Sequence, residues 1–219
     1  MSLAYKSDNS PRMLYRLYPT LLNSFSLYLQ QSRDSAGKII VDEIEMIERI
    51  NRVKKPTTKA QQKGMDFERA VILGEDEELF AEGIIDQARA LIPEKYKTQY
   101  YVESRYKNAL IYGYVDGVGD QIAFDLKSTS FYEPGRFAKN HQNLYLLGLQ
   151  KLGIEQLDYV ITDFKAVYKE TYYLNQYDFS PLYDQIEQFQ AFLEENKKFI
   201  RDKKIFDRKS NDNQLSLFE

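Results

Sequence analysis

The sequence predicts an α/β domain in which a central β-sheet is flanked by helices. Two observations lead to this expectation. Residues 98–127 and 157–174 contain runs that alternate apolar and polar side chains, the period of two that half-buried strands show. Between and around these runs, apolar residues recur at helical spacing. At 219 residues the chain can form one large domain, or one domain with helical appendages.

The N-terminal segment, residues 1–60, is expected to be helical and to pack on the core. Residues 1–12 are polar. A helix should follow and reach residue 29, with Thr20 as its N-cap, because Thr20 precedes a set of leucines and a phenylalanine that share one helical face. A short helix is expected in residues 39–51, and residues 54–59 form a basic linker.

The core is expected in residues 61–209, and residues 210–219 should form a flexible tail. A long helix begins at Thr58, and a second helix, residues 76–91, ends before Pro93. The remaining core elements are predicted, in chain order, as a strand at 98–106, a hairpin of 110–118 and 121–127, a helix at about 136–152, a hairpin of 157–162 and 166–174, and a helix at about 181–206.

Composition excludes several classes of site. The chain has no cysteine, so it cannot form disulfides, zinc–thiolate sites or iron–sulfur clusters. Its net charge of −3 gives no overall basic surface, so a nucleic-acid site would have to be a local patch. No apolar run approaches the length of a membrane span. These features fit a cytoplasmic protein.

The central hairpin carries two carboxylates and a lysine on one face. Gly119-Asp120 is typical of a two-residue turn in which glycine supplies a positive φ. This turn would pair Asp116 with Ala123, so that Asp116 lies diagonally next to Asp125, with Lys127 on the same face. The two carboxylates would repel each other, and Mg²⁺ or Mn²⁺ would relieve the repulsion. The alternative is an exposed, salt-bridged hairpin face.

The arrangement of Asp116 followed by Asp125-Leu126-Lys127 resembles the PD-(D/E)XK nuclease superfamily, and most closely its RecB-like and phage-exonuclease branches. The resemblance extends from about residue 64 to 149. It implies a restriction-endonuclease-like fold, with a central mixed β-sheet flanked by α-helices. It also implies that Asp116, Asp125 and the Leu126 backbone carbonyl bind metal and that Lys127 serves catalysis.

Two further acids are candidates. Gly64, Glu68 and Ile72 follow one another at one-turn spacing, which places Glu68 at the edge of an apolar stripe. Related nucleases carry a glycine, and an acid one turn later, beside the metal, so the resemblance makes Glu68 a third metal ligand; otherwise Glu68 is a solvated helix-edge residue. Glu103 is a second-tier candidate on the strand expected beside Asp116.

Family members often carry a glutamine near the metal, four residues before a tyrosine. Here that spacing from Tyr145 falls on His141, whereas Gln142 has the matching chemistry. We favour Gln142, with His141 and Tyr145 as second-tier candidates that more often have packing roles.

The C-terminal segment Gln214-Leu215-Ser216-Leu217-Phe218 places apolar residues in a polar terminus. It resembles the peptide that binds the bacterial sliding clamp; in such peptides the glutamine hydrogen-bonds the clamp and Leu and Phe fill an apolar pocket. The alternative is a tail that docks on its own domain.

The sequence therefore predicts a Mg²⁺-dependent DNA exonuclease of replication, recombination or repair, encoded by a bacterium or bacteriophage and tethered to the sliding clamp. The alternatives are a non-catalytic DNA-binding or clamp-adaptor module with this fold, and a restriction-type endonuclease. Oligomeric state and strand polarity stay open.

Overall fold

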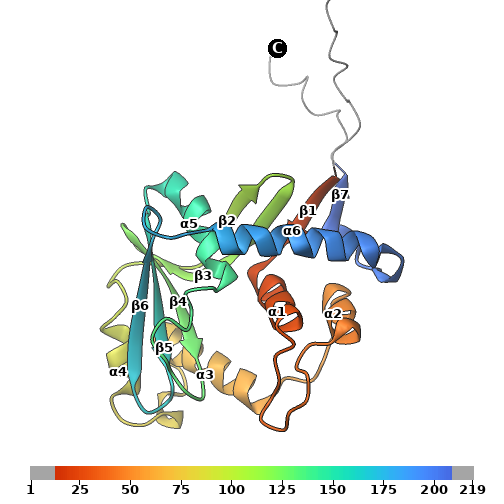
Figure 1. Cartoon of the computed structure of the whole chain (residues 1–219). Coiled ribbons are helices and arrows are strands. Elements are labelled where there is room, and N and C mark those ends of the chain that lie inside the picture. The colour runs from red at the N-terminus through yellow and green to blue at the C-terminus, as the bar shows by residue number, and fades with distance from the viewer. Residues whose placement is uncertain (1–12, 209–219) are drawn as a thin grey trace, which may run out of the picture.

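The computed structural model describes residues 13–208, which form a seven-stranded sheet with helices packed against it (Figure 1). Six strands follow the order β6-β5-β4-β3-β1-β7, and β2 pairs with β3 outside that path. The β1–β3 and β4–β5 pairs are parallel and the others are antiparallel, so the sheet is mixed. The predicted fold class is confirmed.

The strands are β1 (Met13–Leu17), β2 (Lys97–Tyr106), β3 (Ala109–Val118), β4 (Ile122–Ser128), β5 (Gln156–Thr162), β6 (Val167–Tyr173) and β7 (Phe206–Arg208). The α-helices are α1 (Pro19–Leu29), α2 (Glu43–Ile50), α3 (Lys59–Leu73), α4 (Ile84–Arg89), α5 (Tyr145–Leu149) and α6 (Ser180–Glu195). Short 3-10 turns are η1 (Glu77–Leu79), η2 (His141–Leu144), η3 (Gln150–Leu152), η4 (Lys197–Phe199) and η5 (Lys203–Ile205).

The N-terminal segment contributes a strand as well as helices. β1 pairs in parallel with β3 and antiparallel with β7, which joins the two ends of the described chain in one sheet. The predicted cap at Thr20 is wrong, because α1 begins at Pro19 with Tyr18 as N-cap, two residues before the predicted cap, and without a side-chain capping bond. The predicted start of α3 is confirmed: Thr58 and Gln61 form a reciprocal capping box.

Three predicted helices are shorter than expected. Residues 76–91 form η1 and α4 instead of one helix, because Gly83, with φ +79°, interrupts the helical conformation between them. Residues 136–152 contain η2, α5 and η3. The first of these, η2, begins at His141, with Asn140 as its N-cap. α6 ends at Glu195, and the basic segment after it forms η4 and η5 and leads into β7.

The central hairpin has a different turn from the predicted one. Gly119 N donates to the Ile122 carbonyl oxygen (2.9 Å), so the loop residues are Asp120 and Gln121. Gly119 does not have the positive φ that the predicted turn requires. A Cβ there would lie 3.0 Å from Pro93, so glycine at this position allows Pro93 to pack closely against the hairpin. The register shifts by two, which preserves the predicted alternation but brings Asp116 opposite Asp125.

The core has three clusters that place helices around the sheet. α1, α2 and α6 pack on one another at the β1 end, and α6 lies across this part of the molecule (Figure 1). α3 and α4 pack on Phe124, Leu126 and Val160 of β4 and β5. α5 packs against the opposite side of β4 and β5, with Ala123 and Tyr159. Within residues 13–208, no helix is both long and apolar enough to cross a membrane.

Candidate active site

The candidate site lies where the sheet divides. β2 pairs along the whole of one edge of β3. The other edge is shared, because β4 pairs only with Gly117 and Val118 and β1 pairs only with residues 109–111. Between these partners β3 and β4 separate, and the side chains of Asp116 and Asp125 lie at the point of separation.

Asp116 bridges the gap between the two strands. Its Oδ2 accepts a hydrogen bond from the Leu126 backbone N–H (2.7 Å), a donor that strand pairing would otherwise satisfy. Burial raises the pKa of Asp116, against the lowering effects of Lys127 and the Leu126 N–H. The side chain of Asp116 therefore supports the strand geometry and also places a carboxylate at the site.

Glu68 reaches the site from α3. A Cβ at Gly64 would lie 2.8 Å from Ser128 Oγ, so the absence of a side chain there lets α3 approach β4. One turn later Glu68 is half-buried. Burial and the negative charge of Asp116 raise the pKa of Glu68, while Lys127 lowers it. Glu68 therefore lies close enough to Asp116 and Lys127 to interact with their charges, in agreement with its predicted position beside the hairpin.

Gln99 joins Glu68 and Asp116, and the sequence analysis missed it. Its Nε2 donates to Glu68 Oε1 (2.7 Å) and to Asp116 Oδ1 (3.3 Å). Gln99 has φ +47°, and the β2–β3 register passes over the Gln99–Asp116 position. Strained backbone of this kind is found at functional sites. No sequence signal marks it, because glutamine has no preference for positive φ.

Asp125 is 2% exposed and is held by two donors. Lys127 Nζ hydrogen-bonds to its Oδ2, and Gln142 Nε2 donates to its Oδ1 (2.9 Å). Gln142 comes from η2, whose Asn140 caps the turn by accepting from the Gln142 backbone N–H (3.0 Å). Of the two residues that the sequence left open for the glutamine position, Gln142 is the one that contacts an acid of the hairpin.

The Lys127 side chain lies among these carboxylates and is 21% exposed. Burial lowers the pKa of Lys127 to about 8, while the charges of Asp116 and Glu68 raise it. Its Nζ also lies 5.7 Å from the centre of the Tyr159 ring. Lys127 is therefore hydrogen-bonded to Asp125 and interacts through its charge with Asp116 and Glu68.

The donor set fits a hard divalent cation in its chemistry. Glu68 and Asp116 are partly buried acids with raised pKa values, a condition that a bound cation would relieve. As the side chains stand in residues 13–208, no three acidic or histidine groups are gathered closely enough to hold a metal. Asp125 is turned to Lys127 and Gln142, and Asp116 is turned to the Leu126 N–H.

His141 and Tyr145 have packing roles in the structure. His141 is fully buried, and its Nδ1 donates to Asn23 Oδ1 of α1 (2.9 Å). Its Nε2 has no hydrogen-bond partner in the part of the chain that the structure describes, and burial lowers the pKa of His141 to about 3. Tyr145 is buried, with its hydroxyl where a Cβ on Gly113 would lie.

Glu103 lies on β2 away from the acids of the hairpin. It pairs with Tyr112 of β3, whereas Gln99 lies nearest to Asp116. Its carboxylate accepts a hydrogen bond from the Tyr101 hydroxyl (3.3 Å). The clamp-binding segment, residues 214–218, lies outside the described residues.

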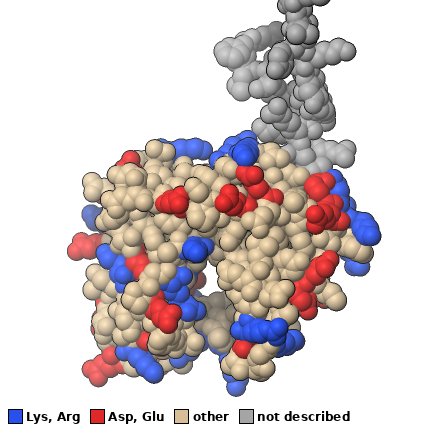
Figure 2. Space-filling view, in the orientation of Figure 1, with Lys and Arg blue, Asp and Glu red and all other residues tan. Residues whose placement is uncertain are grey.

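The surface around these elements is hollowed. Figure 2 shows a depression between the part of the molecule where β5, β6 and α4 lie and the part formed by α1 and α2, with both basic and acidic side chains beside it.

No model of a known protein family matches the sequence, and no curated protein matches it. The fold is similar to that of a presumed exonuclease from Eubacterium rectale, with a TM-score of 0.52, 13% identity, and coverage of 95% of this chain and 90% of that chain. SSO0001 aligns with a TM-score of 0.41 and 12% identity, over 88% of this chain and 80% of its own. Rai1 of Scheffersomyces stipitis aligns with a TM-score of 0.36 and 16% identity, over 84% and 62%. The first similarity shows that this chain shares the α/β fold of that protein.

Proposed function

We propose that the protein is a metal-dependent deoxyribonuclease that acts as an exonuclease. The observation that carries the proposal is the arrangement at the division between β3 and β4, where Lys127 and Gln142 hold Asp125, and Gln99 links Asp116 to Glu68. The resemblance of the Asp125-Leu126-Lys127 segment to PD-(D/E)XK nucleases and the nuclease-like fold support it.

Each side chain has a distinct role in this proposal. Glu68, Asp116, Asp125 and the Leu126 carbonyl would hold Mg²⁺ or Mn²⁺. The bound metal would stabilise negative charge on the scissile phosphate and make a coordinated water a stronger nucleophile. Lys127 would orient water and donate hydrogen bonds to phosphate oxygens from Nζ. Gln142 would fix the orientation of Asp125, with which it is already hydrogen-bonded.

The test compares linear with closed-circular DNA in the presence of Mg²⁺ or Mn²⁺. Asp125→Asn and Lys127→Ala should each lower the cleavage rate about 100-fold or more, because each removes a charged group from the reacting site. Asp158→Asn is a matched control: Asp158 is also an aspartate with 2% exposure beside a lysine, but it lies on β5 next to Lys169. Melting curves of all variants establish that they fold.

The outcomes separate the candidate functions. Degradation of linear DNA alone means an exonuclease, and cleavage of both forms means an endonuclease. No cleavage, with DNA binding intact, means a binding module with a nuclease-like fold. Metal binding has its own readout, since Mn²⁺ should raise the melting temperature of the wild type more than that of Glu68→Gln.

We further propose that residues 214–218 bind a bacterial sliding clamp and thereby bring the nuclease to DNA in the cytoplasm of a bacterium or a phage-infected cell. The sequence match of this segment to clamp-binding peptides supports the proposal. A protein that lacks these five residues should lose the clamp in a pull-down and keep its nuclease activity; unchanged clamp capture would contradict the proposal.

A further inference from the structure

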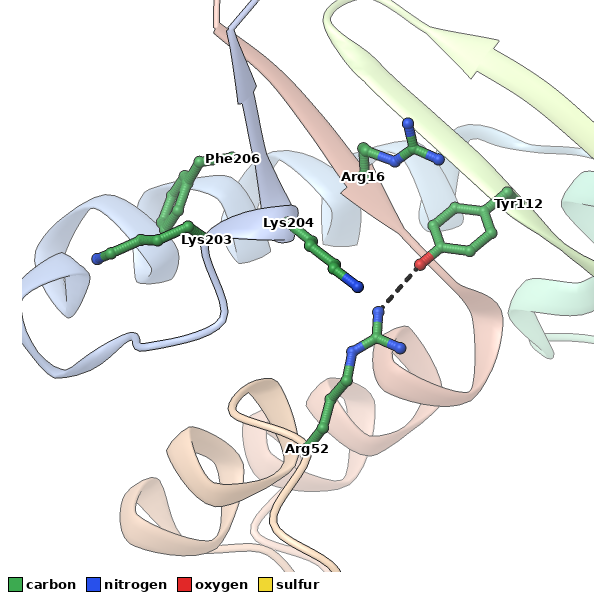
Figure 3. Close-up of a pocket in the computed structure, with 6 residues that line it drawn as sticks. All are labelled: Arg16, Arg52, Tyr112, Lys203, Lys204 and Phe206. Carbon is green, nitrogen blue, oxygen red and sulfur yellow. Dashed lines mark hydrogen bonds between the residues drawn. The ribbon is translucent and has the colours of Figure 1, made fainter.

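A second site lies at the β1–β7 side of the sheet. It is an open pocket of about 580 Å³ to which β1, β3, the end of α2 and η5 contribute (Figure 3). The residues that line it are Arg16, Arg52, Tyr112, Lys203, Lys204 and Phe206. Four of the six are cations, although the whole chain carries a net charge of −3.

The cations are held in place by a small number of contacts. Arg52 donates to Asp202 (2.6 Å) and to the Tyr112 hydroxyl (3.1 Å), so its guanidinium is fixed at the mouth of the pocket. Lys204 points toward Arg52, whereas Lys203 is turned away and donates to the Ile200 carbonyl oxygen (2.7 Å) (Figure 3). Four of the six lining residues are cations and none of the six is acidic, which suits a phosphate group.

Exposed aromatic rings extend from this pocket along β3. The Arg16 guanidinium lies 5.4 Å from the centre of the Tyr112 ring. Two residues further along the strand, Tyr114 is 56% exposed and forms an edge-on pair with Tyr101, which is 42% exposed, at 5.5 Å. Tyr112 and Tyr114 share a face because side chains alternate along a strand.

The exposed tyrosines of β3 lie between the candidate active site and the basic pocket. Tyr114 is two residues from Asp116 and Tyr112 is four, so the pocket begins about 13 Å along β3 from the site. This separation corresponds to about four nucleotides in a stacked strand. Glu103, which accepts from the Tyr101 hydroxyl, makes the region beside the tyrosines unfavourable for phosphates and leaves the rings to contact bases.

We propose that this pocket binds a backbone phosphate of the substrate nucleic-acid strand and that the bases between the pocket and the active site stack on Tyr114 and Tyr101. The inference rests on the proposed nuclease function and gives its substrate a class: an unpaired strand long enough to span both places. Stacking on tyrosine does not depend on base identity, so binding should be independent of sequence.

The experiment measures binding of fluorescent oligothymidylates in EDTA, where metal-dependent cleavage does not occur. One probe has about 12 nucleotides and the other about 3, too few to reach the pocket from the active site. The variants are Lys204→Gln and Tyr114→Ala. Their matched controls lie at the opposite edge of the sheet: Lys165→Gln in the β5–β6 loop and Tyr173→Ala on β6, a tyrosine with 41% exposure.

Lys204→Gln should bind the long probe about fivefold or more weakly and the short probe as the wild type does, whereas Tyr114→Ala, which lies within reach of both probes, should bind both about fivefold or more weakly. Lys204→Gln should also reduce the slope of log affinity against log salt by about 0.7, the value for one phosphate contact to a single strand. Both controls should bind like the wild type. Lys204→Arg should restore the salt slope.

Two results separate this inference from the proposed function. If the wild type cleaves DNA but Lys204→Gln and Tyr114→Ala bind both probes like the wild type, the pocket has no role and the inference is overturned while the nuclease remains. If the long probe is bound through the pocket but no metal supports cleavage, the binding site stands and the nuclease proposal fails.

Discussion

His141 should remain uncharged from pH 8 to pH 5. It is the only histidine in the chain, so a single histidine signal can be followed without assignment. The side chain is fully buried between η2 and α1, with Nδ1–H donated to Asn23. A proton on Nε2 would be a buried charge facing no acceptor in residues 13–208, and burial accordingly lowers the pKa of His141 to about 3.

The consequence for stability follows from the difference between the folded and unfolded states. An unfolded histidine has a pKa of about 6.5, so below that pH the unfolded chain takes up a proton that the folded chain excludes. The free energy of unfolding is therefore unaffected by His141 protonation above pH 6.5. Below pH 6.5 it falls progressively as the pH approaches 3. At pH 5 the loss should be about 2 kcal/mol relative to pH 8.

Two measurements check this reasoning. The ¹H–¹³C signal of histidine Cε1 should not shift between pH 8 and pH 5 in the tag-free protein. Urea unfolding of wild type and His141→Gln should show a stability difference that changes by about 2 kcal/mol over the same range. Because Glu68 and Asp116 are present in both proteins, their titration cancels in the comparison.

A histidine signal that titrates with a midpoint near pH 6.5 would refute the argument. It would mean that water reaches Nε2, and that η2 does not pack on α1 as described. Since η2 also carries Gln142, the same result would remove the support for the Gln142–Asp125 contact.

Substitutions at Gly148 and Gln99 test the packing and the backbone around the site. Gly148→Ala should lower the free energy of unfolding in urea by about 1–3 kcal/mol, because a Cβ would lie 2.4 Å from the Glu103 carbonyl oxygen of β2. Gly153→Ala is the control: nothing lies within 4 Å of a Cβ there, so it measures only the cost of a φ of +76°. Equal losses of stability in the two variants would contradict the packing argument. Gln99→Gly should stay within about 1 kcal/mol of the wild type, while Gln99→Val should lose about 2 kcal/mol, since a β-branched residue resists φ +47°. Equal stability of the two Gln99 variants would show that this φ carries no strain.

The alternation of the central hairpin could be predicted because it depends only on sequence spacing. A shift of two residues leaves every side chain on the same face, so the acids of Asp116 and Asp125 meet whichever turn forms. The register itself could not be predicted, since it depends on Gly119 packing against Pro93 from another segment. The choice of Gln142 over His141 likewise required the position of α1, where Asn23 binds His141.

Other features lie beyond local patterns. β1 has five residues and runs directly into the proline-led start of α1, too short for alternation to distinguish a strand from the beginning of a helix. The positive φ of Gln99 accompanies hydrogen bonds from its side chain to two carboxylates, and these come from α3 and β3, segments that local sequence does not connect. The basic pocket joins residues of β1, α2 and the C-terminal segment, and only the pairing of β1 with β7 brings these distant parts of the chain together.

The geometry of Asp116 determines which variants can test catalysis. β3 and β4 stop pairing after Gly117 and Phe124, and the Leu126 N–H that faces the gap is satisfied by the Asp116 carboxylate. Removal of that carboxylate would leave a partly buried donor unpaired, at a cost of about 1–3 kcal/mol, and would let the strands move. Loss of activity in Asp116→Ala would therefore report a distorted site as readily as a missing ligand. Asp125 contacts Lys127 and Gln142 through side chains alone, so substitution of Asp125 or Lys127 separates chemistry from strand geometry.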